Sequence, residues 1–134
     1  MSSLDLIFSD SRNVSKFLAR GDPLEALAAE LGPKFLDYRR RWELARTFQE
    51  IPPFPLHVDY ELLSDCNLRC PMCPMSSRGR PLGVSQKLNL TKVKELIDEG
   101  TERGQASIGF GGLWEPLLSK DLPEIIAYGR EKGI

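Results

Sequence analysis

The sequence predicts an α/β protein in which an amino-terminal helical segment precedes the first two β/α units of a parallel sheet. Three observations predict this class. Residues 1–54 carry apolar side chains at the three- and four-residue steps of an amphipathic helix. Two later segments, Leu56–Leu63 and Ala106–Phe110, have the character of strands, and a helical pattern follows each. The order strand, helix, strand, helix is typical of parallel β/α units with right-handed crossovers.

The amino-terminal segment, residues 1–54, is interpreted as a helical cap that covers a neighbouring sheet. It divides into two helices at Gly32-Pro33, because proline lacks a backbone donor and suits the first turn of a new helix. An aromatic stripe at helical spacing usually belongs to a core, so we assign no chemistry to it. The stripe comprises Leu24, Leu27, Leu31, Phe35, Tyr38, Trp42 and Ala45.

Residues 55–134 supply the β/α units. Leu56–Leu63 alternates apolar and polar side chains with the period of a strand. Thr91 is the predicted cap of a helix that ends near Gly100 or Gly104, and Asp121 with Glu124 resembles the capping box of the next helix. Parallel sheets normally have more strands and are buried on both faces. We therefore expect an incomplete fold, truncated from a longer protein.

The composition excludes several classes of protein. With 134 residues, 41% hydrophobic and 28% charged, the chain has the make-up of one ordinary soluble domain. A net charge of -1 gives no broad attraction for nucleic acid or for anionic lipid. No segment approaches the roughly 20 apolar residues of a membrane helix. We therefore predict a cytoplasmic protein with neither a nucleic-acid nor a membrane partner.

Three cysteines, Cys66, Cys70 and Cys73, fall within eight residues directly after the first predicted strand. An odd number of cysteines in one cluster does not favour a disulfide framework, so the thiols are interpreted as metal ligands. Pro71 and Pro74 disfavour a helix here and favour a loop. Three thiolates can bind three irons of a four-iron cluster and leave the fourth iron open, which indicates a catalytic rather than a structural site.

The spacing of these cysteines resembles the signature of the radical S-adenosylmethionine superfamily. A second segment agrees with it: Gly111–Leu118, after the second predicted strand, resembles the Gly-Gly-Glu-Pro motif of that family. The resemblance covers about residues 56–134 and implies a partial (β/α) barrel. Two landmarks in the expected order, each at the end of a strand, indicate the family more strongly than either does alone.

The resemblance also implies cofactors and roles. The three cysteines would hold a 4Fe-4S cluster, and an external flavodoxin- or ferredoxin-like donor would reduce it. S-adenosylmethionine would then be cleaved to start radical chemistry on an unidentified substrate, with a peptide as one candidate. The methionine side of this cofactor would be lined by Gly111, Gly112, Glu115 and Pro116, with the carboxylate of Glu115 accepting hydrogen bonds from the ammonium group. The cysteine motif further resembles the subgroup with a carboxyl-terminal auxiliary-cluster (SPASM-type) domain.

Two residues depart from the family pattern. The family usually has an aromatic residue before the third cysteine, near adenine, whereas this chain has Met72, which is apolar and polarizable but cannot stack as a ring. The glycine expected before the acid is Trp114. This tryptophan would either wall a substrate pocket or pack against the following helix.

Three alternatives remain open at this stage. A structural zinc module would use the three cysteines and His57. A thiol–disulfide oxidoreductase would use Cys70 and Cys73, although Pro74 and the polar residues after it predict no helix opening at this motif. A fragment that is inactive alone would be compatible with the family resemblance.

Overall fold

The computed structural model describes residues 23–77 and 86–134. The chain divides into two compact units, Met1–Leu56 and His57–Ile134. The first 22 residues of the predicted helical cap lie outside the described residues. None of the described helices is long and apolar enough to cross a membrane.

The first unit contains helix α2, Pro23–Arg46, which is two helices joined at a kink. Gly32 has φ 70° and ψ -158°, so the predicted break at Gly32-Pro33 is confirmed. The predicted packing stripe is wrong in its first half, because Leu27 and Leu31 are exposed. The kink interrupts the helical repeat, so these leucines do not continue the stripe of Tyr38 and Trp42.

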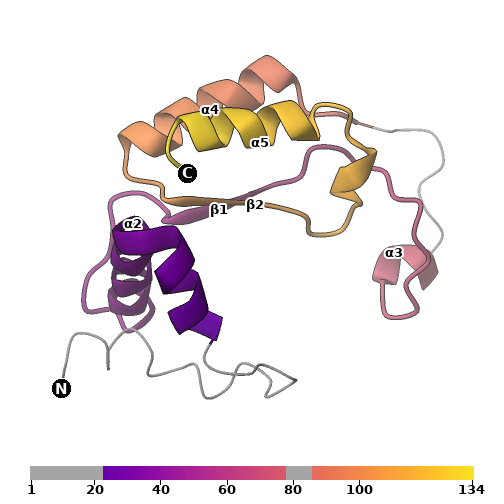
Figure 1. Cartoon of the computed structure of the whole chain (residues 1–134). Coiled ribbons are helices and arrows are strands. Elements are labelled where there is room, and N and C mark those ends of the chain that lie inside the picture. The colour runs from indigo at the N-terminus through magenta and orange to yellow at the C-terminus, as the bar shows by residue number, and fades with distance from the viewer. Residues whose placement is uncertain (1–22, 78–85) are drawn as a thin grey trace. The chain divides into compact units, whose positions relative to one another are not determined.

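The second unit is built on two parallel strands. Strand β1, His57–Tyr60, pairs with β2, Ser107–Phe110, in the register that places His57 beside Ser107. Each strand lies inside its predicted segment and is shorter than it. Parallel neighbours need a crossover, and helix α4, Leu90–Glu102, lies between them in the chain. Figure 1 shows the strands side by side beneath α4.

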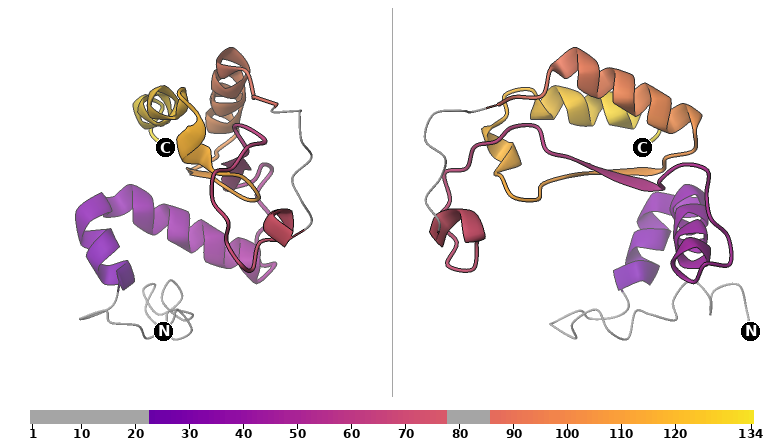
Figure 2. Two further views of the ribbon diagram at one scale, coloured as in Figure 1. Left: turned by 90° about the vertical axis from the view of Figure 1, so that its right-hand side faces the viewer. Right: turned by 180° about the vertical axis from the view of Figure 1, so that it is seen from behind.

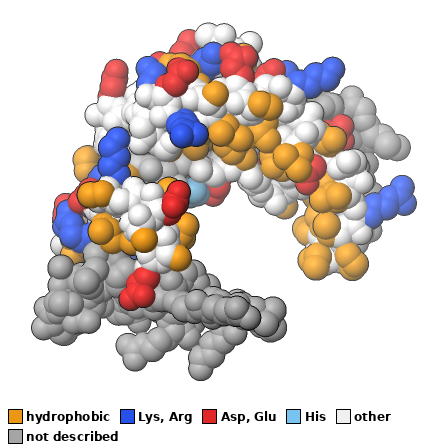
Figure 3. Space-filling view, in the orientation of Figure 1, with side chains coloured by type: hydrophobic (Ala, Val, Ile, Leu, Met, Phe, Trp, Pro, Cys, Tyr) orange, Lys and Arg blue, Asp and Glu red, His pale blue; other side chains and the backbone are white. Residues whose placement is uncertain are grey.

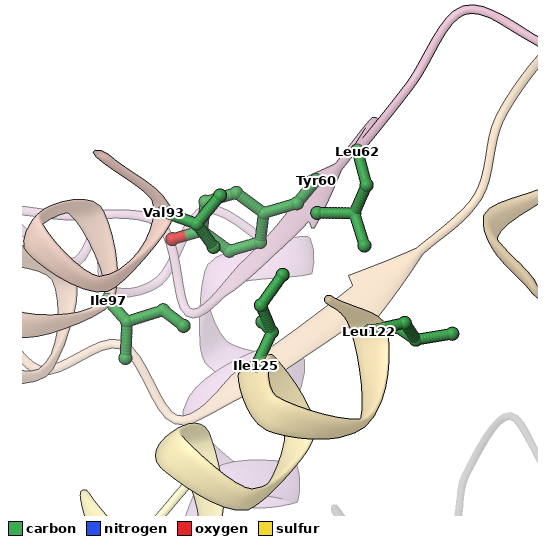
Figure 4. Packing of buried hydrophobic residues seen from close by; sticks show 6 residues of the cluster. All are labelled: Tyr60, Leu62, Val93, Ile97, Leu122 and Ile125. Atoms are coloured by element: carbon green, nitrogen blue, oxygen red, sulfur yellow. The ribbon is translucent and has the colours of Figure 1, made fainter. Parts of the chain in front are cut away.

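Helices α4 and α5, Leu122–Glu131, cover the same face of these strands. Both views in Figure 2 show the two helices together on that side of the sheet. The side chains between them form the core of this unit (Figure 4). Its buried members are Tyr60, Leu62, Val93, Ile97, Leu122 and Ile125.

The starts of both helices differ from the prediction. Asn89, rather than Thr91, caps α4, because its side-chain oxygen accepts hydrogen bonds from the backbone N–H groups of Thr91 and Lys92. Asp121 precedes α5 but makes no capping hydrogen bond. Its carboxylate instead pairs with Lys87 Nζ at 2.7 Å, so the predicted capping box does not form.

Candidate functional site

Two loops leave the same edge of the sheet. The cysteine loop, residues 65–77 as described, follows β1, and the glycine loop, residues 111–116, follows β2. Because β1 and β2 are parallel, their carboxyl ends meet at one edge. That edge is where β/α proteins build their active sites.

The base of the cysteine loop is closed by backbone hydrogen bonds. Ser64 N–H donates to the Gln86 carbonyl at 2.9 Å, and Leu88 N–H donates to the Leu62 carbonyl at 2.9 Å. The two segments run antiparallel here, with a bridge between Leu63 and Lys87. The loop is therefore anchored at both ends, next to the core residue Leu62.

The three cysteines lie in this loop in reduced form. Cys66, Cys70 and Cys73 are each half-buried, and none is in a disulfide. Cys73 N–H donates to the Cys70 carbonyl at 3.0 Å, which closes a turn with Pro71 at its second position. Leu68 N–H donates to Cys66 Sγ at 3.4 Å. Hydrogen bonds of this kind to sulfur are among the features that set the potential of iron–sulfur clusters.

The donor set fits the cluster that the motif predicts. Three thiols, all partly accessible and none in a disulfide, match the ligand number of a cluster with one open iron. In the part of the chain that the structure describes, no three His, Cys, Asp or Glu side chains are already gathered as a metal site.

The glycine loop contains two residues with positive φ angles, and both are glycines. Gly111 has φ 146° and Gly112 has φ 143°, a region that favours glycine. After it, the half-buried Glu115 accepts a hydrogen bond from Leu117 N–H at 3.0 Å and caps the short helix η2, Pro116–Leu118. The carboxylate of Glu115 is thus oriented by the backbone that follows it.

A hydrogen bond joins the two loops, and a second hydrogen bond and a small pocket connect the glycine loop with the segment at the end of β1. Glu115 N–H donates to the carbonyl of Asp65, the residue before the first cysteine, at 3.1 Å. Leu113 N–H donates to Glu61 Oε1 at 2.8 Å. Neither Glu61 nor Asp65 is predicted from the sequence, although Glu61 directly follows β1 and Asp65 directly precedes Cys66. The pocket is lined by Tyr60, Glu61, Leu62, Leu63, Gly111, Trp114 and Pro116.

Trp114 and Met72, the two residues that depart from the family pattern, lie in different surroundings. Trp114 is half-buried and lines that pocket, so it lies beside residues from the end of β1. Met72 is 85% exposed and lies in the turn between the second and third cysteines. Figure 3 shows hydrophobic side chains gathered at the end of the molecule that carries the short helix α3, Pro74–Ser77. Leu68 and Met72, in the loop that leads into α3, are both exposed.

Comparison with known proteins supports the resemblance to the radical S-adenosylmethionine family. The chain is 33% identical over 87 residues to a PqqA peptide cyclase of Xanthomonas campestris pv. campestris, which is 63% of this chain and 21% of the relative. It is 36% identical over 77 residues to the Fe-coproporphyrin III synthase of Methanosarcina barkeri, covering 58% of this chain and 18% of the relative. Both relatives are radical S-adenosylmethionine enzymes of the SPASM type. Over the matched part, this chain is similar to radical S-adenosylmethionine enzymes.

The chain spans about a fifth of the length of these curated radical S-adenosylmethionine relatives. No family model matches the chain, and no solved structure matches it.

The structure bears on the two alternatives to a radical S-adenosylmethionine site. His57 lies at the start of β1, whereas the cysteines follow its end, and its ring contacts Ser107 Oγ at 2.9 Å and Asp59 Oδ1 at 3.3 Å. A zinc site with His57 as fourth ligand therefore has no support. The prediction that no helix opens at the Cys70–Cys73 motif is wrong, because α3 begins directly after Cys73. That helix is a single turn of four residues, too short to supply a strong dipole to a redox thiol.

Proposed function

We propose that this chain is the part of a radical S-adenosylmethionine enzyme that binds the cluster and the cofactor. Cys66, Cys70 and Cys73 would hold a 4Fe-4S cluster, and the glycine loop, residues 111–116, would hold the methionine portion of S-adenosylmethionine. One observation carries the proposal. The two predicted motifs follow adjacent parallel strands at one edge, and the Asp65–Glu115 backbone hydrogen bond joins them.

The residues of the chain have distinct tasks in this proposal. The three thiolates hold three irons and leave the fourth for the cofactor. Gly111 and Gly112 let the backbone approach a ligand closely, because they present no Cβ. Glu115 supplies a carboxylate that can accept charge-assisted hydrogen bonds from an ammonium group. When bound and reduced, the cluster would supply the one electron that the reductive cleavage of S-adenosylmethionine requires.

We propose a partial (β/α) barrel as the complete fold, with the second unit as its first two β/α units. The parallel pairing of β1 and β2 supports this, as does the position of α4 and α5 on one face. In the described chain the other face carries polar side chains, among them His57, Asp59 and Ser107. Such a face would line the interior of a barrel, while the helices cover its outside.

Substrate and partners follow from the relatives by analogy. The name PqqA peptide cyclase states that the Xanthomonas protein acts on a peptide, and we propose a peptide substrate here too. The reductant would be a flavodoxin- or ferredoxin-like donor. Three thiols outside any disulfide suit a reducing compartment, which supports a cytoplasmic location.

The test is anaerobic reconstitution of the chain with iron and sulfide, followed by metal analysis and a visible absorption spectrum. We expect about four irons per chain, as a four-iron cluster requires, and broad absorption in the visible blue. Cys66→Ala, Cys70→Ala and Cys73→Ala should each lose most of the iron. Met72→Ala, a change in the same turn at a residue without a thiol, should retain it.

Two results would contradict the proposal. A colourless protein that holds one zinc per chain would promote the structural zinc module. A protein that takes up no metal and forms a reversible Cys70–Cys73 disulfide would promote the thiol–disulfide oxidoreductase.

A further inference from the structure

Glu61 connects the end of the first strand to the glycine loop. It is the residue directly after β1, and its side chain is exposed. Its Oε1 accepts a hydrogen bond from Leu113 N–H at 2.8 Å, across 52 residues of sequence. A carboxylate that accepts from a backbone N–H forms one of the stronger classes of hydrogen bond.

The same carboxylate contacts Gly112. A Cβ added at Gly112 would clash with Glu61 Oε1, whereas a Cβ added at Gly111 would meet nothing within 4 Å. The two glycines have nearly equal φ angles, 146° at Gly111 and 143° at Gly112. Any side chain is therefore strained at both positions, and only at Gly112 would it also displace the flexible Glu61 carboxylate from its hydrogen bond with Leu113 N–H.

A second hydrogen bond joins the segment after β1 to the glycine loop, a few residues further along each. The Asp65 carbonyl accepts from Glu115 N–H at 3.1 Å. Leu113 and Glu115, which flank Trp114, are thus both held by the segment that leads from β1 into the cysteine loop. The Glu61 contact is the one of the two that depends on a side chain.

We propose that Glu61 is a positioning residue, which holds the Gly111–Leu113 turn in the conformation that receives the amino-acid portion of S-adenosylmethionine. This role rests on the proposed function of the glycine loop. Glu61 acts through the loop backbone, because one of its oxygens is already engaged by Leu113 N–H. Glutamine at this position would keep an acceptor oxygen, and alanine would not.

The first experiment compares Glu61→Ala and Glu61→Gln in the full reconstituted chain. Anaerobic titration calorimetry with S-adenosylmethionine measures the dissociation constant, and iron analysis measures cluster content. We expect Glu61→Ala to weaken binding about fivefold, the size of one net hydrogen bond. Glu61→Gln should stay within about twofold of wild type, and both variants should keep their iron.

The second experiment uses the two glycines as a matched pair. Gly112→Ala should weaken S-adenosylmethionine binding more than Gly111→Ala, because it adds the clash with Glu61 to the same backbone strain. In a Glu61→Ala background that difference should disappear. Such non-additivity is the signature of two side chains in direct contact.

The outcomes separate this role from the proposed function. If wild type binds S-adenosylmethionine and Glu61→Ala binds it equally well, the positioning role is overturned and the proposed function stands. If Glu61→Ala also loses its iron, Glu61 maintains the fold at large and the role is again overturned. If wild type binds no S-adenosylmethionine, the proposed function fails and this role fails with it.

Discussion

The two sides of the second unit are built in different ways. On the helix-covered face, Val93 and Ile97 are fully buried at 0% exposure and pack with side chains from β1 and α5. At the loop edge, Met72 is 85% exposed and Leu117 is 80% exposed. The cysteine and glycine loops are held there by a few hydrogen bonds, such as Asp65–Glu115 and Glu61–Leu113.

This difference predicts which substitutions should affect stability and which should affect ligand binding. Burial of apolar surface stabilises the helix-covered face without any cofactor. The loop edge has reduced thiols, positive-φ glycines and exposed apolar side chains, features that a bound group would engage. Substitutions in the core should therefore change stability, and substitutions at the loop edge should change ligand binding.

The largest effect on stability is expected from Ile97→Ala. The side chain is fully buried in the core, so its truncation leaves a cavity and should cost about 3 kcal/mol of unfolding free energy. Ile126→Ala removes the same atoms from a half-exposed position on α5 and is the matched control. Urea unfolding followed by circular dichroism measures both. Equal losses would contradict the assignment of the core.

A smaller effect is expected at the start of α4. Asn89→Ala removes the side chain that accepts from the N–H groups of Thr91 and Lys92, and should cost about 1 kcal/mol. Thr91→Ala is the control, because Thr91 lies inside the helix and its side chain is not the cap. Urea unfolding of the two variants should show a loss for Asn89 alone, and the opposite ranking would refute this cap.

A still smaller effect on stability, one that depends on pH, is expected where Asp98 of α4 pairs with Tyr128 and Lys132. A hydrogen bond from Lys132, followed by one from Tyr128, lowers the pKa of Asp98 below its ordinary 3.8. The stability contributed by Asp98 is therefore present above pH 3.8 and is lost as pH falls through its lower folded pKa. Unfolding of wild type and Asp98→Asn should differ at pH 7 and converge toward about pH 2. A difference that persists unchanged in acid would contradict this pairing.

The smallest effect on stability is expected at the cysteines. Cys70→Ala in the metal-free protein should change the unfolding free energy by less than about 0.5 kcal/mol, as surface substitutions usually do. The same substitution should remove most of the bound iron after reconstitution. Thermal unfolding of the metal-free variant, beside iron analysis of the reconstituted one, separates the two effects. A large loss of stability without metal would show that Cys70 belongs to the core.

The sequence predicts the regular elements of the second unit well, because their signals are local. The alternation around Val58 and Tyr60 indicates β1, and the spacing of Val93 and Ile97 indicates the buried side of α4. The motif that contains the three cysteines is also local. Its family assignment is confirmed by the curated relatives over the matched part of the chain.

The features that the sequence does not predict depend on distant residues. Asp121 fails to cap α5 because its carboxylate pairs with Lys87, which lies 34 positions earlier in the chain. Glu61 contacts the glycine loop across 52 residues, and no local pattern indicates that contact. The cap at Asn89 is a different case: both Asn89 and Thr91 are capping residue types, and only the position of the first helical turn decides between them.

We propose that the cysteine loop and the glycine loop form one ligand site. Electron paramagnetic resonance of the reduced, reconstituted chain, recorded with and without S-adenosylmethionine, is the test of this proposal. We predict a reduced-cluster signal that changes when S-adenosylmethionine is added to wild type, and a weaker change at the same concentration in Glu115→Ala. A reduced-cluster signal that S-adenosylmethionine leaves unchanged in wild type would contradict the claim.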